Sequence, residues 1–394
     1  MVHELASAVS ASKAAQATVV VFSSVGCENN AHLPYRLVKL DRCAGNAGRI
    51  AGAVWSWLRD NPQDCVFLND VSELWSVVPI LSTVSPVVLV VHNEARRDRR
   101  PLAMFGDHLA AVVVVASYLK QLVTKTTGYP ADRVHIISNG SEFPAVSEER
   151  TWLPKSKVRL LYAGRIDYLQ KGVLDLPRVL HSVRRKTADH VELTVVGPGP
   201  IGPLRRSLAS RGLTACTRLM DRVNRFELFS LAARHDFLLV PSRFESFGMV
   251  TIEAMSMGCV PIAYNIPSGS RDIIRPGQTG VLVRFPSWRA MAAAIVSLAR
   301  DPDRTARMGR AAARDVRARF TITRTAREYL EVAQIARARW RAARSRTVGP
   351  EHPPVDEVSQ GRAIGIPGMA GRRLLRPILE RSPRLARWLW RRFA

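Results

Sequence analysis

Short apolar runs alternate with amphipathic segments along the first half of the chain. Helical patterns cover residues 1–15 and 45–61, and Ser117 is placed to cap a further helix. Strands that alternate with helices are typical of βαβ units, so this half is expected to form a parallel sheet. The apolar runs that predict its strands are residues 17–22, 65–68, 86–91, 111–116 and 134–137.

The second half repeats this alternation after a break. Residues 141–157 carry charge, Ser and Pro without a clear period, and they predict an interdomain linker. Long helical patterns follow near the end, at residues 291–300, 304–320 and 323–339. The apolar runs that predict strands here are residues 158–162, 191–196, 237–241, 260–263 and 280–283.

Length and composition favour a globular protein of two domains. A chain of 394 residues exceeds the usual size of one core, and 47% of its residues are hydrophobic. No signal peptide is visible, and no apolar run approaches the ~20 residues of a membrane span. The cysteines show no metal-ligand spacing, which favours a reduced cytoplasmic interior where they only pack. They are Cys27, Cys43, Cys65, Cys216 and Cys259.

The net charge of +25 comes mostly from Arg. Codon bias in a GC-rich genome explains part of such a composition, but a basic surface still attracts anionic partners. Nucleotide-sugars, acidic lipids and nucleic acid all qualify. No zinc-finger, RNA-recognition or helix-turn-helix signature supports nucleic acid.

The segment at residues 241–265 carries the strongest chemical signal. It places Glu245 and Glu253 eight positions apart, the first on a predicted strand-to-helix loop and the second in the helix that follows. We expect this helix at residues 250–257, with Gly258 as its stop. The backbone N–H groups from Met249 to Thr251 should then be unpaired and form an anion site.

This segment resembles the signature of GT4-type retaining GT-B glycosyltransferases, the glycosyltransferase group 1 family. That signature is a Glu, seven residues and a Glu, with Phe-Gly after the first and Glu-Ala-Met at the second, as in this chain. The resemblance covers roughly residues 86–332. Stretches that agree in order are residues 137–140, 160–165, 171–172, 193–197, 268–272 and 276–283.

The resemblance implies an α/β GT-B fold, with two Rossmann-like domains that face a central cleft. We expect an N-terminal acceptor domain at residues 1–145 and a C-terminal donor domain at residues 155–318. A helix at residues 319–345 should cross back to the N-terminal domain, and a Pro-containing linker and basic tail follow at 346–394. Because the first residues already have a helical pattern, the N-terminal domain is predicted to lack the family's first strand and Gly-rich loop.

The resemblance also implies roles for particular residues. Arg165 and Lys171 would bind the donor diphosphate, although their spacing is one residue longer than in the commonest family form. Glu253 would accept hydrogen bonds from the ribose, and Glu245 would stabilise charge near the anomeric carbon. His92 would lie near sugar and acceptor; the alternative is a structural histidine. The predicted catalytic residues are therefore Glu245, His92, Arg165 and Lys171. The remaining predicted donor-binding residues are Gly164, Gly197, Phe247, Gly248, Met249, Val250, Thr251 and Glu253.

We therefore expect a metal-independent, hexosyltransferase-type enzyme that needs no cofactor beyond its nucleotide-diphosphate sugar. Asp301 and Asp303 are assigned to a helix start rather than to a metal. A lipid-linked or glycan acceptor in cell-envelope synthesis is predicted, with the protein peripheral on the inner face of the plasma membrane. Arginines interleave with Leu, Ile, Trp and Phe in residues 371–394, a pattern typical of binding to an anionic membrane.

Two alternatives remain at this point. One is a catalytically impaired paralogue that lacks the acceptor loop and only binds nucleotide-sugar. The other is a basic nucleic-acid-binding α/β protein, against which Arg165, Glu245 and Glu253 argue together. The tail has its own alternative, which is packing against the body of the protein.

Overall fold

A computed structural model describes residues 2–21, 36–39, 47–69, 72–93, 96–145, 157–187 and 190–347. Residues 1–342 form one compact unit, which holds all the sheets described below. Residues 343–394 form a second unit, of which only the last residues of one helix are described. The linker prediction at residues 141–157 falls largely outside the described residues, and the tail prediction falls almost wholly outside them.

The first half contains a four-stranded parallel sheet in the order β3-β4-β5-β6. Its central strands, β4 and β5, are buried along their whole length, which explains why they are nearly pure Val and Leu. A separate pair, β1 and β2, is also parallel. The strands are β1 (Thr18–Val21), β2 (Arg36–Lys39), β3 (Val66–Asn69), β4 (Val87–Val91), β5 (Ala111–Val114) and β6 (Val134–Ile136). The helices are α1 (Val2–Ala11), α2 (Ala47–Asp60), η1 (Ser72–Val77), α3 (Val78–Val84), α4 (Arg96–Phe105), η2 (Gly106–His108), α5 (Ser117–Thr127) and η3 (Ala131–Arg133).

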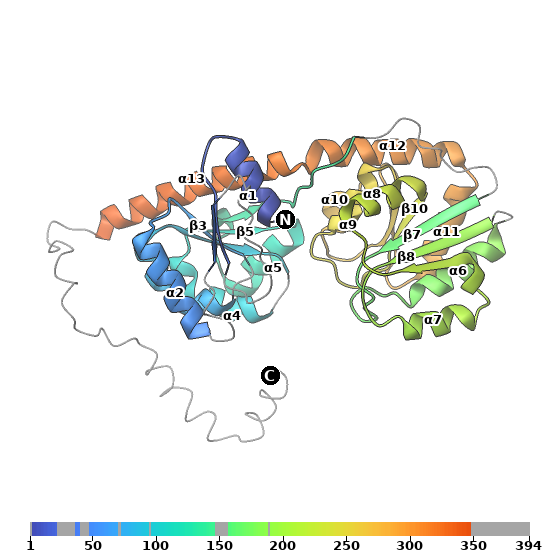
Figure 1. Cartoon of the computed structure of the whole chain (residues 1–394), viewed down its shortest axis with the longest axis horizontal. Helices are drawn as coiled ribbons and strands as arrows, with labels where there is room; N and C mark the ends of the chain where they lie inside the picture. Colours follow the sequence, from blue (N-terminus) through green and yellow to red (C-terminus); the bar gives the residue numbers. More distant parts are fainter. Residues whose placement is uncertain are drawn as a thin grey trace, which may run out of the picture. The chain divides into compact units, whose positions relative to one another are not determined.

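The second half contains a six-stranded parallel sheet in the order β12-β11-β10-β7-β8-β9 (Figure 1). This is the doubly wound order, and its direction reverses between β7 and β10. The strands are β7 (Lys157–Ala163), β8 (His190–Val196), β9 (Thr217–Met220), β10 (Phe237–Val240), β11 (Val260–Tyr264) and β12 (Val281–Val283). The helices are α6 (Asp175–Lys186), α7 (Gly202–Ala209), η4 (Thr214–Cys216), α8 (Arg225–Arg234), α9 (Met249–Ser256), α10 (Ser270–Ile273) and α11 (Trp288–Ala299). Ligands of such sheets bind where the strand order reverses, so a binding site is expected at the loops after β7 and β10.

Two long helices join the halves. Helix α12 (Pro302–Arg319) packs on α9 and β11, and α13 (Ile322–Thr347) begins after a turn at Phe320. The carbonyl of Phe320 accepts a hydrogen bond from the Ser141 amide at 2.9 Å. Buried side chains of α13, including Tyr329 and Val332, share a core with the Val residues of β4 and β5 (Figure 1). Helix α13 therefore packs on the sheet of the first half.

The structure corrects three details of the sequence prediction. Strands β2 and β9 were not predicted, because neither contains a run of apolar residues. Ser117 does not cap α5: the N-cap is Ala116, and no side chain caps the helix. Instead, the Ser117 amide and hydroxyl both donate to the carboxylate of Asp272, with the amide 2.7 Å from Oδ2. Asp301 caps α12 as predicted, by accepting from the Arg304 amide.

Candidate functional site

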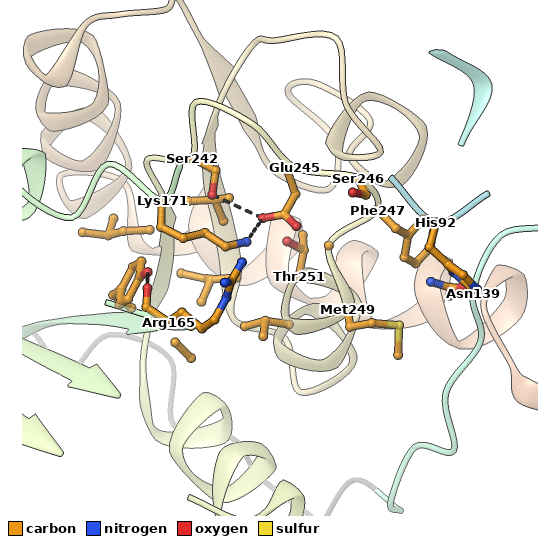
Figure 2. Close-up of a pocket in the computed structure, with 18 residues that line it drawn as sticks. His92, Asn139, Arg165, Lys171, Ser242, Glu245, Ser246, Phe247, Met249 and Thr251 are labelled. Carbon is orange, nitrogen blue, oxygen red and sulfur yellow. Dashed lines mark hydrogen bonds and ion pairs between the residues drawn. The ribbon is translucent and has the colours of Figure 1, made fainter. Parts of the chain in front are cut away.

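A cavity of about 330 Å³ lies at the carboxyl ends of β7 and β10, where the sheet order reverses (Figure 2). Most of its lining comes from the loop after β7, the loop after β10 and the first turn of α9. His92 and Asn139 complete it from the ends of β4 and β6. The lining residues are His92, Asn139, Tyr162, Ala163, Gly164, Arg165, Lys171, Leu238, Leu239, Val240, Ser242, Glu245, Ser246, Phe247, Gly248, Met249, Val250 and Thr251.

An ion pair between Lys171 and Glu245 lies in this cavity. The Lys171 Nζ is 2.6 Å from Glu245 Oε2, and the two side chains are only 16% and 17% exposed. The Ser242 hydroxyl donates to the same carboxylate oxygen at 3.2 Å. Figure 2 shows both interactions within the cavity. The two predicted catalytic groups, 74 residues apart in the chain, therefore meet.

The turn before Lys171 is held by Asp167. Its Oδ1 accepts from the amides of Leu169 and Gln170 at 2.9 and 2.7 Å, and this hydrogen bonding lowers the pKa of the Asp167 carboxyl. Such local capping stabilises a tight turn. The extra residue between Arg165 and Lys171 therefore does not prevent Lys171 from reaching Glu245.

Arg165 reaches toward the same carboxylate from the end of β7 (Figure 2). One guanidinium nitrogen donates to the Gln170 side-chain oxygen at 2.8 Å. Its carbonyl accepts from the Tyr162 hydroxyl at 2.6 Å. Burial is the main cause that raises the pKa of Tyr162, so this phenol remains a neutral donor. The Arg165 backbone is thus held by the Tyr162 hydroxyl, while its side chain faces the cavity.

The N-terminus of α9 forms another wall of the cavity. Gly248, the N-cap, has φ = 110°, a conformation that residues with a side chain rarely adopt. The Thr251 amide donates to the Gly248 carbonyl at 2.9 Å, so the prediction of unpaired amides was wrong at Thr251. Among the described residues, the amides of Met249 and Val250 have no backbone acceptor. These two are therefore the donors that the helix N-terminus can offer to an anion.

Glu253 lies outside the lining of the cavity. It is 8% exposed on α9, and its Oε1 is 3.1 Å from the Nε of Arg225. Burial raises the pKa of the Glu253 carboxyl, Arg225 opposes this shift, and Glu4 of α1 adds to it. The structure thus places the predicted ribose-binding carboxylate outside the lining of the cavity, in a separate charged pair with Arg225.

Gly197 is also absent from the lining. A Cβ atom on this residue would lie 2.0 Å from the Gly164 carbonyl oxygen, and its own φ is 142°. Its amide donates to the Met220 carbonyl at 3.1 Å. The structure therefore explains this glycine by the close approach of the turns after β7 and β8.

His92 lies at the carboxyl end of β4 and lines the cavity as predicted. Its Nε2 is 3.1 Å from the side-chain oxygen of Asn69, the last residue of β3. Several further lining residues had no predicted role, and three of them are Asn139, Tyr162 and Ser242. All three lie near the carboxyl end of a predicted strand, and that position is the signal that would have identified them.

Within the described ranges, no three His, Cys, Asp or Glu side chains gather as metal ligands. No described helix is long and apolar enough to cross a membrane.

Comparison with known sequences identifies the family. The profile described as "Glycosyl transferases group 1" matches residues 147–315, and that of "Glycosyltransferase Family 4" matches residues 1–142. The chain belongs to the group 1 glycosyltransferases. The two profiles together match both halves of the molecule, including the elements β7, β10 and α9 that form walls of the cavity.

Curated relatives within this family match part of the chain. A glycogen synthase of Mycobacterium tuberculosis is 30% identical over 233 residues, which cover 56% of this chain and 54% of the relative. A D-inositol 3-phosphate glycosyltransferase of Thermobispora bispora is 31% identical over 218 residues, which cover 52% and 50%. The chain thus spans about half the length of these relatives.

Solved structures confirm the GT-B fold of this group 1 glycosyltransferase. A sucrose-phosphate synthase from Thermosynechococcus elongatus superposes with a TM-score of 0.70 at 18% identity, over 86% of this chain and 93% of that one. The Anabaena protein HepE, solved with UDP and glucose, gives a TM-score of 0.65 at 16% identity, over 84% and 95%. At such identities the likeness establishes the fold alone.

Proposed function

We propose that this protein is a retaining glycosyltransferase, of the hexosyltransferase type, that moves a sugar from a nucleotide-diphosphate sugar to an acceptor hydroxyl. The observation that carries the proposal is the gathering of Arg165, Lys171 and Glu245 around one cavity at the N-terminus of α9. The two cations and the helix N-terminus match the negative charge of a diphosphate. The carboxylate matches the positive charge that develops on the sugar during transfer.

Departure of the diphosphate is the difficult part of such a reaction. Negative charge develops on the leaving oxygen, and preorganised cations stabilise it most. Arg165 and Lys171, together called the diphosphate clamp below, supply that charge, and the free amides of Met249 and Val250 add the helix dipole. We propose that these groups take the place of a metal ion, so that transfer needs no cofactor.

Glu245 would act on the sugar. In the structure its carboxylate is held by Lys171 and Ser242. A diphosphate bound to Lys171 would share that ammonium, which leaves the carboxylate facing positive charge that develops at the anomeric carbon. We propose attack by the acceptor on the face that the diphosphate leaves, which retains the anomeric configuration. We propose that His92, which also lines the cavity, contacts the sugar and the acceptor.

For the acceptor we propose a lipid-linked or cell-envelope glycan at the inner face of the plasma membrane. The support is the composition of the tail: residues 361–394 contain nine arginines and one acid, Glu380, interleaved with Trp388, Trp390 and Phe393. Each basic residue near an anionic bilayer contributes about 1 kcal/mol. Such a tail would concentrate the enzyme beside a lipid-linked substrate.

A ligand-stability screen with UDP-, GDP- and ADP-sugars tests the proposal. A nucleotide-sugar that binds the native state raises the melting temperature by mass action. UDP-sugars are the first choice, because HepE was solved with UDP-glucose. The sugar that stabilises the protein is then tested for transfer to glycan and lipid acceptors. Stabilisation without any transfer would support the impaired-paralogue alternative, and no stabilisation by any nucleotide would refute the proposed function.

A further inference from the structure

Arg225 links four segments of the chain behind α9. It is the first residue of α8, after the capping box formed by Asn224. Its Nε lies 3.1 Å from Glu253 Oε1, while its two terminal nitrogens contact Glu4 of α1 and the hydroxyl of Ser141. The Nε–H does not point at an acceptor, so its contact with Glu253 is electrostatic rather than an aligned hydrogen bond.

Glu253 continues a helical face that lines the cavity. Met249 and Val250, four and three residues before it, are both cavity residues. Positions three and four apart lie on the same side of a helix. The Glu253 carboxylate is therefore the next group along that face of α9. A nucleoside attached to a diphosphate in the cavity would extend in this direction.

The charges around Glu253 are few and opposed. The carboxylate is 8% exposed, and Arg225 is its paired cation among the described residues. Glu4 lies on the far side of the same guanidinium, so two carboxylates share one cation. A buried carboxylate remains charged only when it is paired, so Arg225 favours the ionised form of Glu253, while burial and Glu4 oppose it.

We propose that Arg225 is a positioning residue for donor binding: it keeps Glu253 ionised as an acceptor for the nucleoside hydroxyls, while Glu4 weakens that hold. This inference rests on the proposed function, in which Glu253 binds the ribose. It assigns to α1 and α8 a share in donor affinity, although neither contributes a residue to the lining of the cavity.

Arg225 and Glu4 should act in opposite directions. Burial already raises the pKa of Glu253, and Arg225 opposes that shift, so Arg225→Met raises the pKa further. Glu4 raises it, so Glu4→Gln lowers it. Because only the ionised carboxylate accepts two hydroxyl hydrogen bonds well, affinity for nucleotide in Arg225→Met should fall on acidification at a higher pH than in the parent. In Glu4→Gln the fall should occur at a lower pH.

The test is calorimetry of UDP binding by the full chain between about pH 5.5 and about pH 8.5, a range above the ordinary pKa of a glutamate. GDP or ADP replaces UDP if the stability screen selects it. Arg225→Met should lose roughly tenfold in affinity at about pH 6 and recover most of it at about pH 8. Arg225→Lys, which keeps the charge, should restore much of the loss.

Two controls separate positioning from folding. Arg234→Met removes the same charge from the exposed last turn of α8, and it should leave the pH profile unchanged. Glu253→Gln has no carboxylate to titrate, so adding Arg225→Met to it should cause no further pH dependence. Suppose that the parent binds UDP and that Arg225→Met loses the same affinity at every pH: this result overturns the inference alone. A pH profile of Glu4→Gln that moves toward higher pH also overturns the inference alone. A parent that binds no nucleotide at any pH overturns both the inference and the proposed function.

Discussion

The Lys171–Glu245 pair permits a prediction with a magnitude. Lys171→Met removes the ammonium and keeps most of the side-chain volume. We consider the Lys171 ammonium and one negative charge of a bound diphosphate. At an effective dielectric constant of about 20, two such unit charges about 4 Å apart attract each other by about 4 kcal/mol. Because both side chains keep some contact with solvent, at 16% and 17% exposure, we take about half of this value. A loss of about 2 kcal/mol corresponds to roughly 30-fold weaker binding of the diphosphate.

The Glu245 carboxylate should weaken UDP binding further in the single variant Lys171→Met. In Lys171→Met, Glu245 has lost the cation at 2.6 Å and directs an unneutralised charge at the incoming diphosphate. The double variant Lys171→Met/Glu245→Gln removes both charges, so that the pair is neutral overall, as in the parent. We therefore expect UDP affinity to be highest in the parent, intermediate in the double variant and lowest in Lys171→Met.

Calorimetry with UDP measures this order, and thermal unfolding of each variant without ligand shows whether the fold survives. Glu245→Gln alone should bind UDP as well as the parent or better, but it should transfer sugar more slowly, because its role is greater in the transition state. A double variant that binds UDP no better than Lys171→Met would refute the electrostatic account of the cavity. Equal affinity of Lys171→Met and the parent would remove Lys171 from the diphosphate clamp.

Three further predictions concern the clamp, the tail and the core. Arg165→Ala should weaken UDP binding with little change in melting temperature. Sugar transfer by the parent should persist in excess EDTA because cationic side chains replace Mg²⁺; a complete loss of transfer that Mg²⁺ restores would contradict this mechanism. Truncation after Pro354 should abolish co-sedimentation with anionic vesicles and spare UDP binding, whereas equal co-sedimentation of both proteins would exclude the tail as the anchor. Asp236→Ala should cost about 3 kcal/mol of unfolding free energy, since it removes the buried partner of Arg159; a denaturant midpoint equal to that of the parent would contradict the role of this pair.

Much of the fold was predictable because its strands are buried on both faces. Such strands contain almost only apolar residues, so the runs at β4, β5 and β10 are visible in the sequence. The segment from β10 through α9 to β11 was also predicted, because Gly248 and Gly258 bound the helix at residues with positive φ. The crossing of α13 was expected from the family resemblance, and in the structure its buried stripe at Tyr329, Val332 and Ala336 packs on β4 and β5.

Elements at the edge of a sheet were harder to predict. Strand β9 has partly exposed residues and includes Arg218, and β2 pairs only with β1 among the described strands. Without a continuous apolar run, neither gives a periodic signal. Ser117 shows another limit. A serine before a helix predicts a local cap, but here its hydroxyl bonds to Asp272, 155 residues later, because packing brings α10 to the start of α5.

The two glutamates of the signature separate what sequence determines from what only tertiary structure decides. The sequence by itself places Glu245 on a loop and Glu253 on a helix, because local propensity and the glycines around them determine those elements. It does not determine their partners. Glu245 pairs with Lys171 because β7 and β10 are neighbours at the point where the sheet order reverses. Glu253 pairs with Arg225, which Glu4 shares, because α8 packs beside α9 and the Arg225 side chain reaches α1. Both pairings join residues far apart in the chain, and charge pairing at such distances depends on strand order and burial, which local pattern does not encode.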